Sequence, residues 1–94
     1  MEFEVKHDFD NQKFFVLVDG KEAYLRYILG NDNTMNMIKT YVPPELRNNG
    51  IAAAVVLKGM QYARENNLNV IPSCSYVGTF IRRHTEFRDL ILEF

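Results

Sequence analysis

The chain is poor in the features that mark secreted and membrane-spanning proteins. Of its 94 residues one is cysteine and none is tryptophan. A single cysteine cannot form an internal disulfide, and the N-terminus has no apolar run preceded by basic residues of the kind that directs secretion. No run of about 18 apolar residues is present that could span a membrane. We therefore expect a cytoplasmic protein that does not enter a membrane.

The sequence also lacks an excess of charge of either sign. Its formal net charge is −1, from 11 basic and 12 acidic residues that are scattered along the chain. Bulk electrostatic attraction to nucleic acid is therefore disfavoured, whereas acidic and basic partners both remain open. Apolar residues make up 47% of the sequence, and its length suits one domain with a single core over residues 1–94. No metal site is expected.

The first half of the chain has the pattern of strands joined by tight turns. Apolar and polar residues alternate in residues 1–8, and β-branched and aromatic residues are enriched in three further runs. Asp19-Gly20 and the segment 30–33 are hairpin signals. The expected strands are 1–8, 14–18, 23–29 and 34–42, the last with imperfect alternation and a stop at Pro43 and Pro44.

The second half predicts a long helix, a short strand and a second helix. Apolar residues recur near every fourth position in residues 49–66, residues 68–71 form a short buried strand, and residues 76–84 form the second helix. The tail, 87–94, is expected to form a last strand or a turn. Gly59 lies inside the long helix, where glycine costs roughly 1 kcal/mol relative to alanine, so we expect a close contact there with the sheet or with a neighbouring chain.

The segment from Tyr41 to Ala54 is the most informative about function. It leads from a strand through a turn into a helix of small residues. The first turn of a helix has backbone N–H groups without intrahelical partners, and the helix dipole adds partial positive charge there. Gly50 and the alanines after it would let a diphosphate reach the backbone, and Arg47 would add a cation. A plain helix start is the alternative interpretation.

Two segments resemble the GNAT superfamily of N-acetyltransferases. Arg47-Asn48-Asn49-Gly50-Ile51-Ala52 matches the Arg/Gln-x-x-Gly-x-Gly/Ala pyrophosphate loop of that family, placed between a fourth strand and a long helix. Val42 to Arg47 and the Pro-Ser-Cys-Ser-Tyr run at Pro72 to Tyr76 match the short, stand-alone, single-domain members. The resemblance covers the whole chain.

This resemblance implies an α+β fold with a mixed sheet. It has N-terminal antiparallel hairpins, fourth and fifth strands that splay apart, the main helix between them in the chain, and a second helix after strand five. Acetyl-CoA would lie in the gap, with its pantetheine arm on strand four and its pyrophosphate on the backbone amides from Arg47 to Ala52. The implied cofactor-binding residues are Tyr41, Val42, Arg47, Asn48, Asn49, Gly50, Ile51, Ala52, Ser75 and Tyr76.

The implied activity is acetyl-CoA-dependent transfer of acetyl to an unidentified amine on a protein, a peptide or a small molecule. A module that binds CoA with little or no catalysis is the alternative. Two departures from the family favour that alternative. The fourth strand has no carboxylate, and Arg82 stands where many relatives have a tyrosine that protonates the CoA thiolate. Larger relatives have two helices between their first strands, whereas this chain has only a turn. The acceptor site should therefore be open, in a monomer or a weak homodimer.

Cys74 is the candidate catalytic residue. It lies at a strand-to-helix turn, where unpaired amides and the helix dipole would lower the pKa of a thiol from about 8.5. Its thiolate could accept acetyl or its thiol could protonate CoA, although buried cysteines often only pack. An amine with a pKa near 10.4 must also lose a proton, and the candidates for the base are Glu22, Glu45, His84 or a chain of waters.

The second helix leaves two further alternatives open. The basic run from Arg82 to His84 could contact the 3′-phosphate of CoA or a nucleic acid, or could simply stabilise the helix C-terminus. Tyr76 could stack on the cofactor or fill the core.

Overall fold

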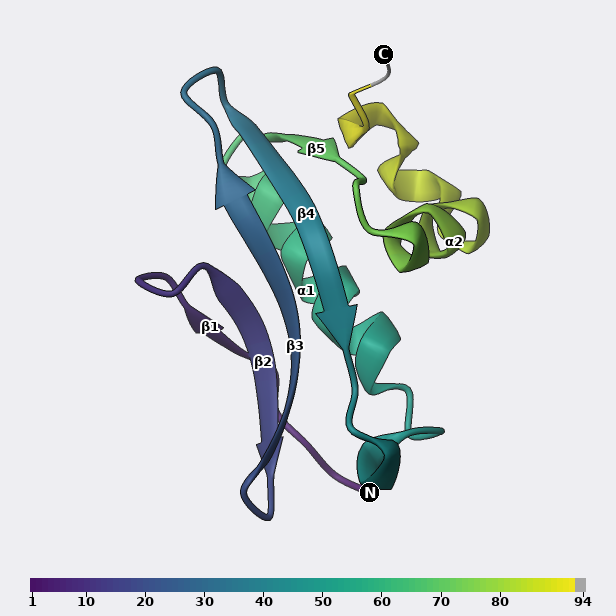
Figure 1. Cartoon of the computed structure of the whole chain (residues 1–94). Coiled ribbons are helices and arrows are strands. Elements are labelled where there is room, and N and C mark those ends of the chain that lie inside the picture. Colours follow the sequence, from purple (N-terminus) through teal and green to yellow (C-terminus); the bar gives the residue numbers. More distant parts are fainter. Residues whose placement is uncertain (93–94) are drawn as a thin grey trace.

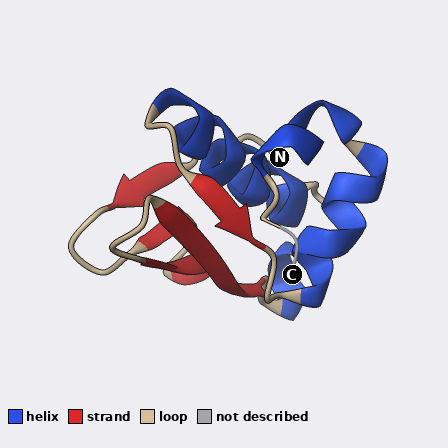
Figure 2. Cartoon of the chain, turned by 90° about the horizontal axis from the view of Figure 1, so that it is seen from above, coloured by secondary structure: helices blue, strands red, loops and turns tan. Residues whose placement is uncertain are grey.

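The computed structural model describes residues 1–92 as a five-stranded mixed sheet with helices on one face (Figure 1). The strands lie in the order β1-β2-β3-β4-β5. Seen from above, the helices gather on one side of the sheet and leave its other face bare (Figure 2). In chain order the elements are β1 (Lys6–Asp8), β2 (Lys13–Val18), β3 (Lys21–Leu29), β4 (Thr34–Tyr41), the 3₁₀ helix η1 (Pro44–Leu46), α1 (Ile51–Glu65), β5 (Asn69–Ile71), α2 (Ser75–Arg83) and the 3₁₀ helix η2 (Thr85–Leu90).

The sheet is antiparallel except at its last pair of strands. Strands β1 to β4 pair antiparallel, whereas β4 and β5 are parallel and pair over only three residues, ending at Asn36 and Ile71. One more backbone bond follows, from the amide of Cys74 to the carbonyl oxygen of Met37 at 2.9 Å. The predicted α+β fold and the predicted separation of strands four and five are both confirmed.

The register between β3 and β4 shifts, which explains the imperfect alternation in the fourth strand. Arg26 pairs with Lys39, but the next residue, Tyr27, pairs with Met37. Ile38 is therefore an extra residue in β4. An extra residue interrupts the two-residue period of a strand and bends it locally.

The core lies between the sheet and α1. Alternate residues of each strand face the helix, and the hydrophobic side of α1 packs on them. Gly59 of α1 is buried at this contact, where a Cβ would lie 2.9 Å from Leu25 Cδ2 and 3.0 Å from Met37 Cε. The expected close contact of this glycine is thus with the sheet. Buried core residues include Phe14, Val16, Leu25, Tyr27, Met35, Met37, Val55, Val56, Met60, Val77 and Phe80.

Within residues 1–92, no helix has the length and apolar character needed to cross a membrane.

The first expected strand is much shorter than predicted. Only Lys6–Asp8 forms β1, and the chain before it is not in a strand. Phe3 and Val5 are instead partly buried against the core. The alternation that suggested a strand over residues 1–8 therefore reflects burial of these two side chains, not a full-length edge strand.

The C-terminal segment also differs from the expectation of a strand or turn over residues 87–94. Residues Thr85–Leu90 form η2, and only Ile91 bridges to β5. Arg64 of α1 holds this segment through two hydrogen bonds to the Asp89 carboxylate, of 3.0 and 2.9 Å, and Phe87 and Leu90 are buried. Residues 93–94 lie outside the described part of the chain.

Two glycine-to-alanine substitutions test the packing of α1. At Gly59 the added methyl overlaps buried side chains, and overpacking of a core costs roughly 1–3 kcal/mol, more than the gain of about 1 kcal/mol in helix propensity. Gly59→Ala should therefore lower the free energy of unfolding by about 1 kcal/mol. Gly78 lies inside α2, and a Cβ there would meet no atom within 4 Å. Gly78→Ala should raise the same quantity by up to about 1 kcal/mol. Urea denaturation measures both, and equal effects would contradict the close contact at Gly59.

Candidate functional site at the start of helix α1

The turn before α1 presents a run of backbone amides without protein partners. Gly50 caps the helix in the left-handed conformation, with φ 74°, and Asn48 is also left-handed, with φ 66°. The amide of Ala54 donates to the carbonyl oxygen of Gly50 at 3.1 Å. None of the six amides from Asn48 to Ala53 donates a hydrogen bond to a described residue. Such a run, at the positive end of a 15-residue helix, suits an anionic group.

The amide of Arg47 differs from the six that follow it. It donates to the carbonyl oxygen of Pro44 at 3.3 Å, as the last turn of η1 requires. The run of unpartnered amides therefore begins at Asn48, one residue after the start of the segment Arg47 to Ala52 that we predict to bind an anion.

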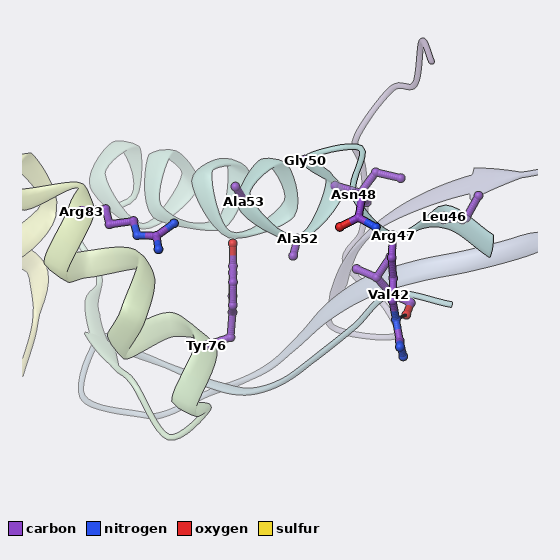
Figure 3. Close-up of a pocket in the computed structure, with 10 residues that line it drawn as sticks. Val42, Leu46, Arg47, Asn48, Gly50, Ala52, Ala53, Tyr76 and Arg83 are labelled. Carbon is purple, nitrogen blue, oxygen red and sulfur yellow. Dashed lines mark hydrogen bonds between the residues drawn. The ribbon is translucent and has the colours of Figure 1, made fainter. Parts of the chain in front are cut away.

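A pocket of about 350 Å³ lies beside these amides. Its walls come from the end of β4, from η1, from the first turn of α1 and from α2 (Figure 3). It is lined by Val42, Leu46, Arg47, Asn48, Gly50, Ile51, Ala52, Ala53, Tyr76 and Arg83. The fold thus brings together seven of the ten predicted cofactor-binding residues, and it adds Leu46, Ala53 and Arg83.

The three other predicted binding residues lie outside this lining. Asn49 braces the turn, since its side-chain amide donates to the carbonyl oxygens of Leu46 and Arg47, each at 3.1 Å. Tyr41 is exposed at the end of β4 and lies beside Tyr24 of β3, with ring centroids 5.8 Å apart. Ser75 is the exposed first residue of α2.

Two arginines border the pocket from different elements. The Nε of Arg47 donates to the carbonyl oxygen of Val42 at 3.0 Å, which fixes the base of this side chain. Arg83 comes from the last turn of α2, beyond Tyr76, whose ring extends toward α1 (Figure 3). Burial raises the pKa of the Tyr76 hydroxyl, although Arg83 lowers it in part, so the phenol stays neutral near pH 7.

Cys74 caps α2 beside the edge of β4. Its half-buried thiol donates to Thr40 Oγ1 at 3.5 Å. Burial raises the pKa of the thiol, but the hydrogen bond with the Thr40 hydroxyl and the nearby backbone amides of Tyr76 and Val77 outweigh burial and place the pKa below its usual value. The sequence indicated a lowered pKa at this turn, but not the contact with Thr40, because that contact depends on how α2 packs on β4.

The three side chains considered as bases do not meet at this site. Glu22 is paired with Lys13 on the bare face of the sheet, at 3.0 Å. Glu45 is exposed on η1, 3.9 Å from Lys21. His84 ends α2, where its ring stacks on Phe80 with centroids 4.1 Å apart. None of the three lines the pocket.

Comparisons with known proteins agree with this geometry. A sequence model of the family described as GCN5-related N-acetyl-transferase matches residues 13–90. The chain is also similar to a GCN5-like protein from Staphylococcus aureus, a candidate N-acetyltransferase whose structure was determined by NMR in solution. The two are 28% identical, with a TM-score of 0.75 over 97% of this chain and 89% of the other.

The contact between Thr40 and Cys74 predicts how the thiol titrates. Once the thiol ionises, the Thr40 hydroxyl can donate to the thiolate and stabilise it. Thr40→Val removes this donor, so it should raise the pKa of Cys74, and Thr40→Ser should largely restore it. The rate of alkylation by iodoacetamide against pH reports this pKa, since only the thiolate reacts. Identical profiles for the wild type and Thr40→Val would show that the hydroxyl does not stabilise the thiolate.

Proposed function

Because the chain belongs to the GCN5-related N-acetyl-transferase family, we propose that it transfers the acetyl group of acetyl-CoA to an amine, with the donor bound at the start of α1. The observation that supports this most is the run of unpartnered amides from Asn48 to Ala53 beside the pocket, which all of these residues except Asn49 line. A diphosphate offers several acceptor oxygens to such a run.

The residues around the pocket fit the diphosphate end of acetyl-CoA. A Cβ at Gly50 would meet no atom within 4 Å, so the space over this turn is open. Ala52 and Ala53 add only methyl groups beside the amides. A volume of about 350 Å³ suits part of a nucleotide-sized ligand and leaves the remainder outside the pocket.

The two arginines would neutralise donor phosphates from opposite sides. Arg47 has its Nε engaged with Val42, so its terminal nitrogens are the ones offered to an anion. We assign Arg83 to a second phosphate of the donor, because its side chain borders the same pocket as the free amides. Tyr76, between the amides and Arg83, would give the ligand a flat neutral surface (Figure 3).

The remainder of the donor would follow the unpaired edge of β4. Pairing with β5 ends at Asn36, so the edge beyond Met37 faces no other strand within residues 1–92. We assign the backbone of Tyr41 and Val42 to the pantetheine arm. The carbonyl oxygen of Val42 already accepts from Arg47, so it is less available than we expected from the sequence.

Cys74 is the residue that we assign to the chemistry. When bound, acetyl-CoA supplies a thioester, whose C–S bond breaks as the amine nitrogen forms a bond to the acetyl carbon. The amine gives up a proton and the sulfur that leaves gains one. A thiol with a lowered pKa can supply that second proton, or its thiolate can take the acetyl group first and pass it to the amine. Glu22, Glu45 and His84 border neither the pocket nor Cys74, so we assign the proton of the amine to water.

One observation favours a second candidate function, a CoA-binding module with little turnover. Strand β4 has no carboxylate between Thr34 and Tyr41. Binding of acetyl-CoA is common to both functions, and only turnover separates them. Release of free CoA thiol should therefore be followed with a panel of peptides, polyamines and small amines, and silence across the whole panel would favour the module.

Two matched glycine substitutions test the donor site. Gly50→Asp places a negative charge over the amides and should weaken the affinity for acetyl-CoA by about tenfold or more, since repulsion of roughly 1.4 kcal/mol suffices for that factor. Gly20 is also left-handed and open, in the β2–β3 turn. Gly20→Asp therefore carries the same backbone strain and charge and should bind acetyl-CoA like the wild type. Isothermal titration calorimetry measures both. Equal affinities would place the donor elsewhere.

Substitution of Cys74 tests the chemistry separately from binding. Cys74→Ala should leave the affinity for acetyl-CoA nearly unchanged while turnover falls by about 10²-fold or more, as expected for loss of a proton donor or nucleophile. Unchanged turnover would show that Cys74 only packs. Mass spectrometry after incubation with acetyl-CoA alone separates the two roles, because acetyl on Cys74 indicates the nucleophile and its absence indicates the acid.

A further inference from the structure

The face of the sheet opposite α1 is uncovered and carries large apolar side chains. We call it the open face (Figure 2). Leu17 of β2 and Ile28 of β3 are 60% and 50% exposed there, and Tyr41 of β4 is 39% exposed. The first residues of the chain do not cover it, since Phe3 and Val5 pack against the core on the other side.

A row of three cations crosses the open face. Lys13 of β2 is directly opposite Arg26 of β3, and Arg26 is directly opposite Lys39 of β4. Glu22 binds Lys13 with both carboxylate oxygens at 3.0 Å. Arg26 and Lys39 are exposed and form no ion pair with any residue in the part of the chain that the structure describes. Like charges directly opposite each other destabilise a sheet, so folding alone does not account for this row.

Apolar groups flank the two free cations along the strands. On one side, Tyr24 and Tyr41 form the next cross-strand pair on this face. On the other side is Ile28, two residues after Arg26 on β3. A partner that matches this surface would carry carboxylates next to aromatic or aliphatic side chains.

Two residues of the open face are direct neighbours in β4 of the residue that Cys74 contacts. Thr40 of β4 accepts the hydrogen bond of the Cys74 thiol. Its neighbours Lys39 and Tyr41 pair with residues of the open face. Because successive side chains of a strand point to opposite faces, a molecule held on the open face lies against the same short stretch of β4 as the thiol.

Given the proposed function, on which this step rests, we propose that the open face docks the acetyl acceptor and that the acceptor is an acidic segment of a protein. Its carboxylates pair with Arg26 and Lys39, and its apolar side chains lie on Tyr24, Tyr41 and Ile28. Such docking would bring an amine of the acceptor to the edge of β4 and would replace the wall of helices that this chain lacks.

Two other occupants fit the surface less well. A nucleic acid would bring its phosphates toward Glu22, which forms an ion pair with Lys13, and toward Asp8, which is directly opposite Lys13 across β1 and β2. A second copy of the chain would place one row of cations against another. Both arrangements bring like charges together. An acidic polypeptide can instead place its carboxylates beside Arg26 and Lys39 and away from the carboxylates of Glu22 and Asp8.

Peptide binding tests this surface without any acetyl transfer. The probe is a fluorescein-labelled peptide of Glu, Asp, Tyr and Leu residues, and its partner has Gln and Asn in place of the acids. By fluorescence anisotropy the acidic peptide should bind at least about tenfold more tightly, with an affinity that falls as salt rises. The double variant Arg26→Glu and Lys39→Glu should remove this preference. Lys58→Glu, the same charge change on the exposed side of α1, should retain it.

Further measurements keep folding and the donor site apart from docking. Arg26→Glu relieves the repulsion within the row, so its melting temperature should not fall, and the double variant should bind acetyl-CoA like the wild type. Equal affinity for the two peptides would overturn the proposal, as would tighter binding of an oligothymidylate or a dimer that dissociates in the double variant. Failure of the wild type to bind acetyl-CoA would instead overturn the donor site and leave the peptide result intact.

Discussion

The early end of the pairing between β4 and β5 is the constraint on which the rest of the site depends. Pro72 follows directly after β5 and has no N–H to donate to a ladder. The amide of Ser73 turns back to the carbonyl oxygen of Ile71 at 3.1 Å, and the Ser73 hydroxyl donates to Asn36 Oδ1 at 2.6 Å. The chain therefore leaves the β4–β5 ladder after Ile71, and the amide of Cys74, the cap of α2, makes one further backbone hydrogen bond to Met37 of β4. This departure leaves the edge of β4 beyond Met37 free of β5 and places Cys74 beside it.

The one-sided arrangement of the helices gives the two faces of the sheet different roles. On the covered face, α1 and α2 meet the end of β4 and enclose the pocket with the free amides. On the open face the same strand presents Lys39 and Tyr41 to solvent. In the proposed function the donor occupies the covered side and the acceptor approaches from the bare side, with the edge of β4 between them. A sheet covered on both faces could not separate the two substrates in this way.

The turn before α1 shows how backbone conformation prepares a binding surface. Asn48 and Gly50 are left-handed, a conformation that glycine adopts freely and that asparagine tolerates better than most residues. Asn49 holds the turn through two side-chain hydrogen bonds to carbonyl oxygens and so leaves the backbone amides free. Each of the three residues serves the conformation of the turn, and the proposed anion contacts come from the main chain.

The sequence by itself determined the features that depend on neighbouring residues. The start of α1 to within two residues, the end of β4 before Pro43 and the turn at Asp19-Gly20 follow from backbone preferences. The matched segments around Gly50 and Cys74 indicated the family. Only the tertiary structure decided that Cys74 contacts Thr40 and that Arg83 lines the pocket. It also decided that Arg64 holds η2 and that Phe3 and Val5 pack against the core outside any strand. Thr40 and Cys74 are 34 positions apart, and Arg64 and Asp89 are 25 apart. Contacts over such separations depend on how whole elements pack, and no local pattern of residues specifies that packing.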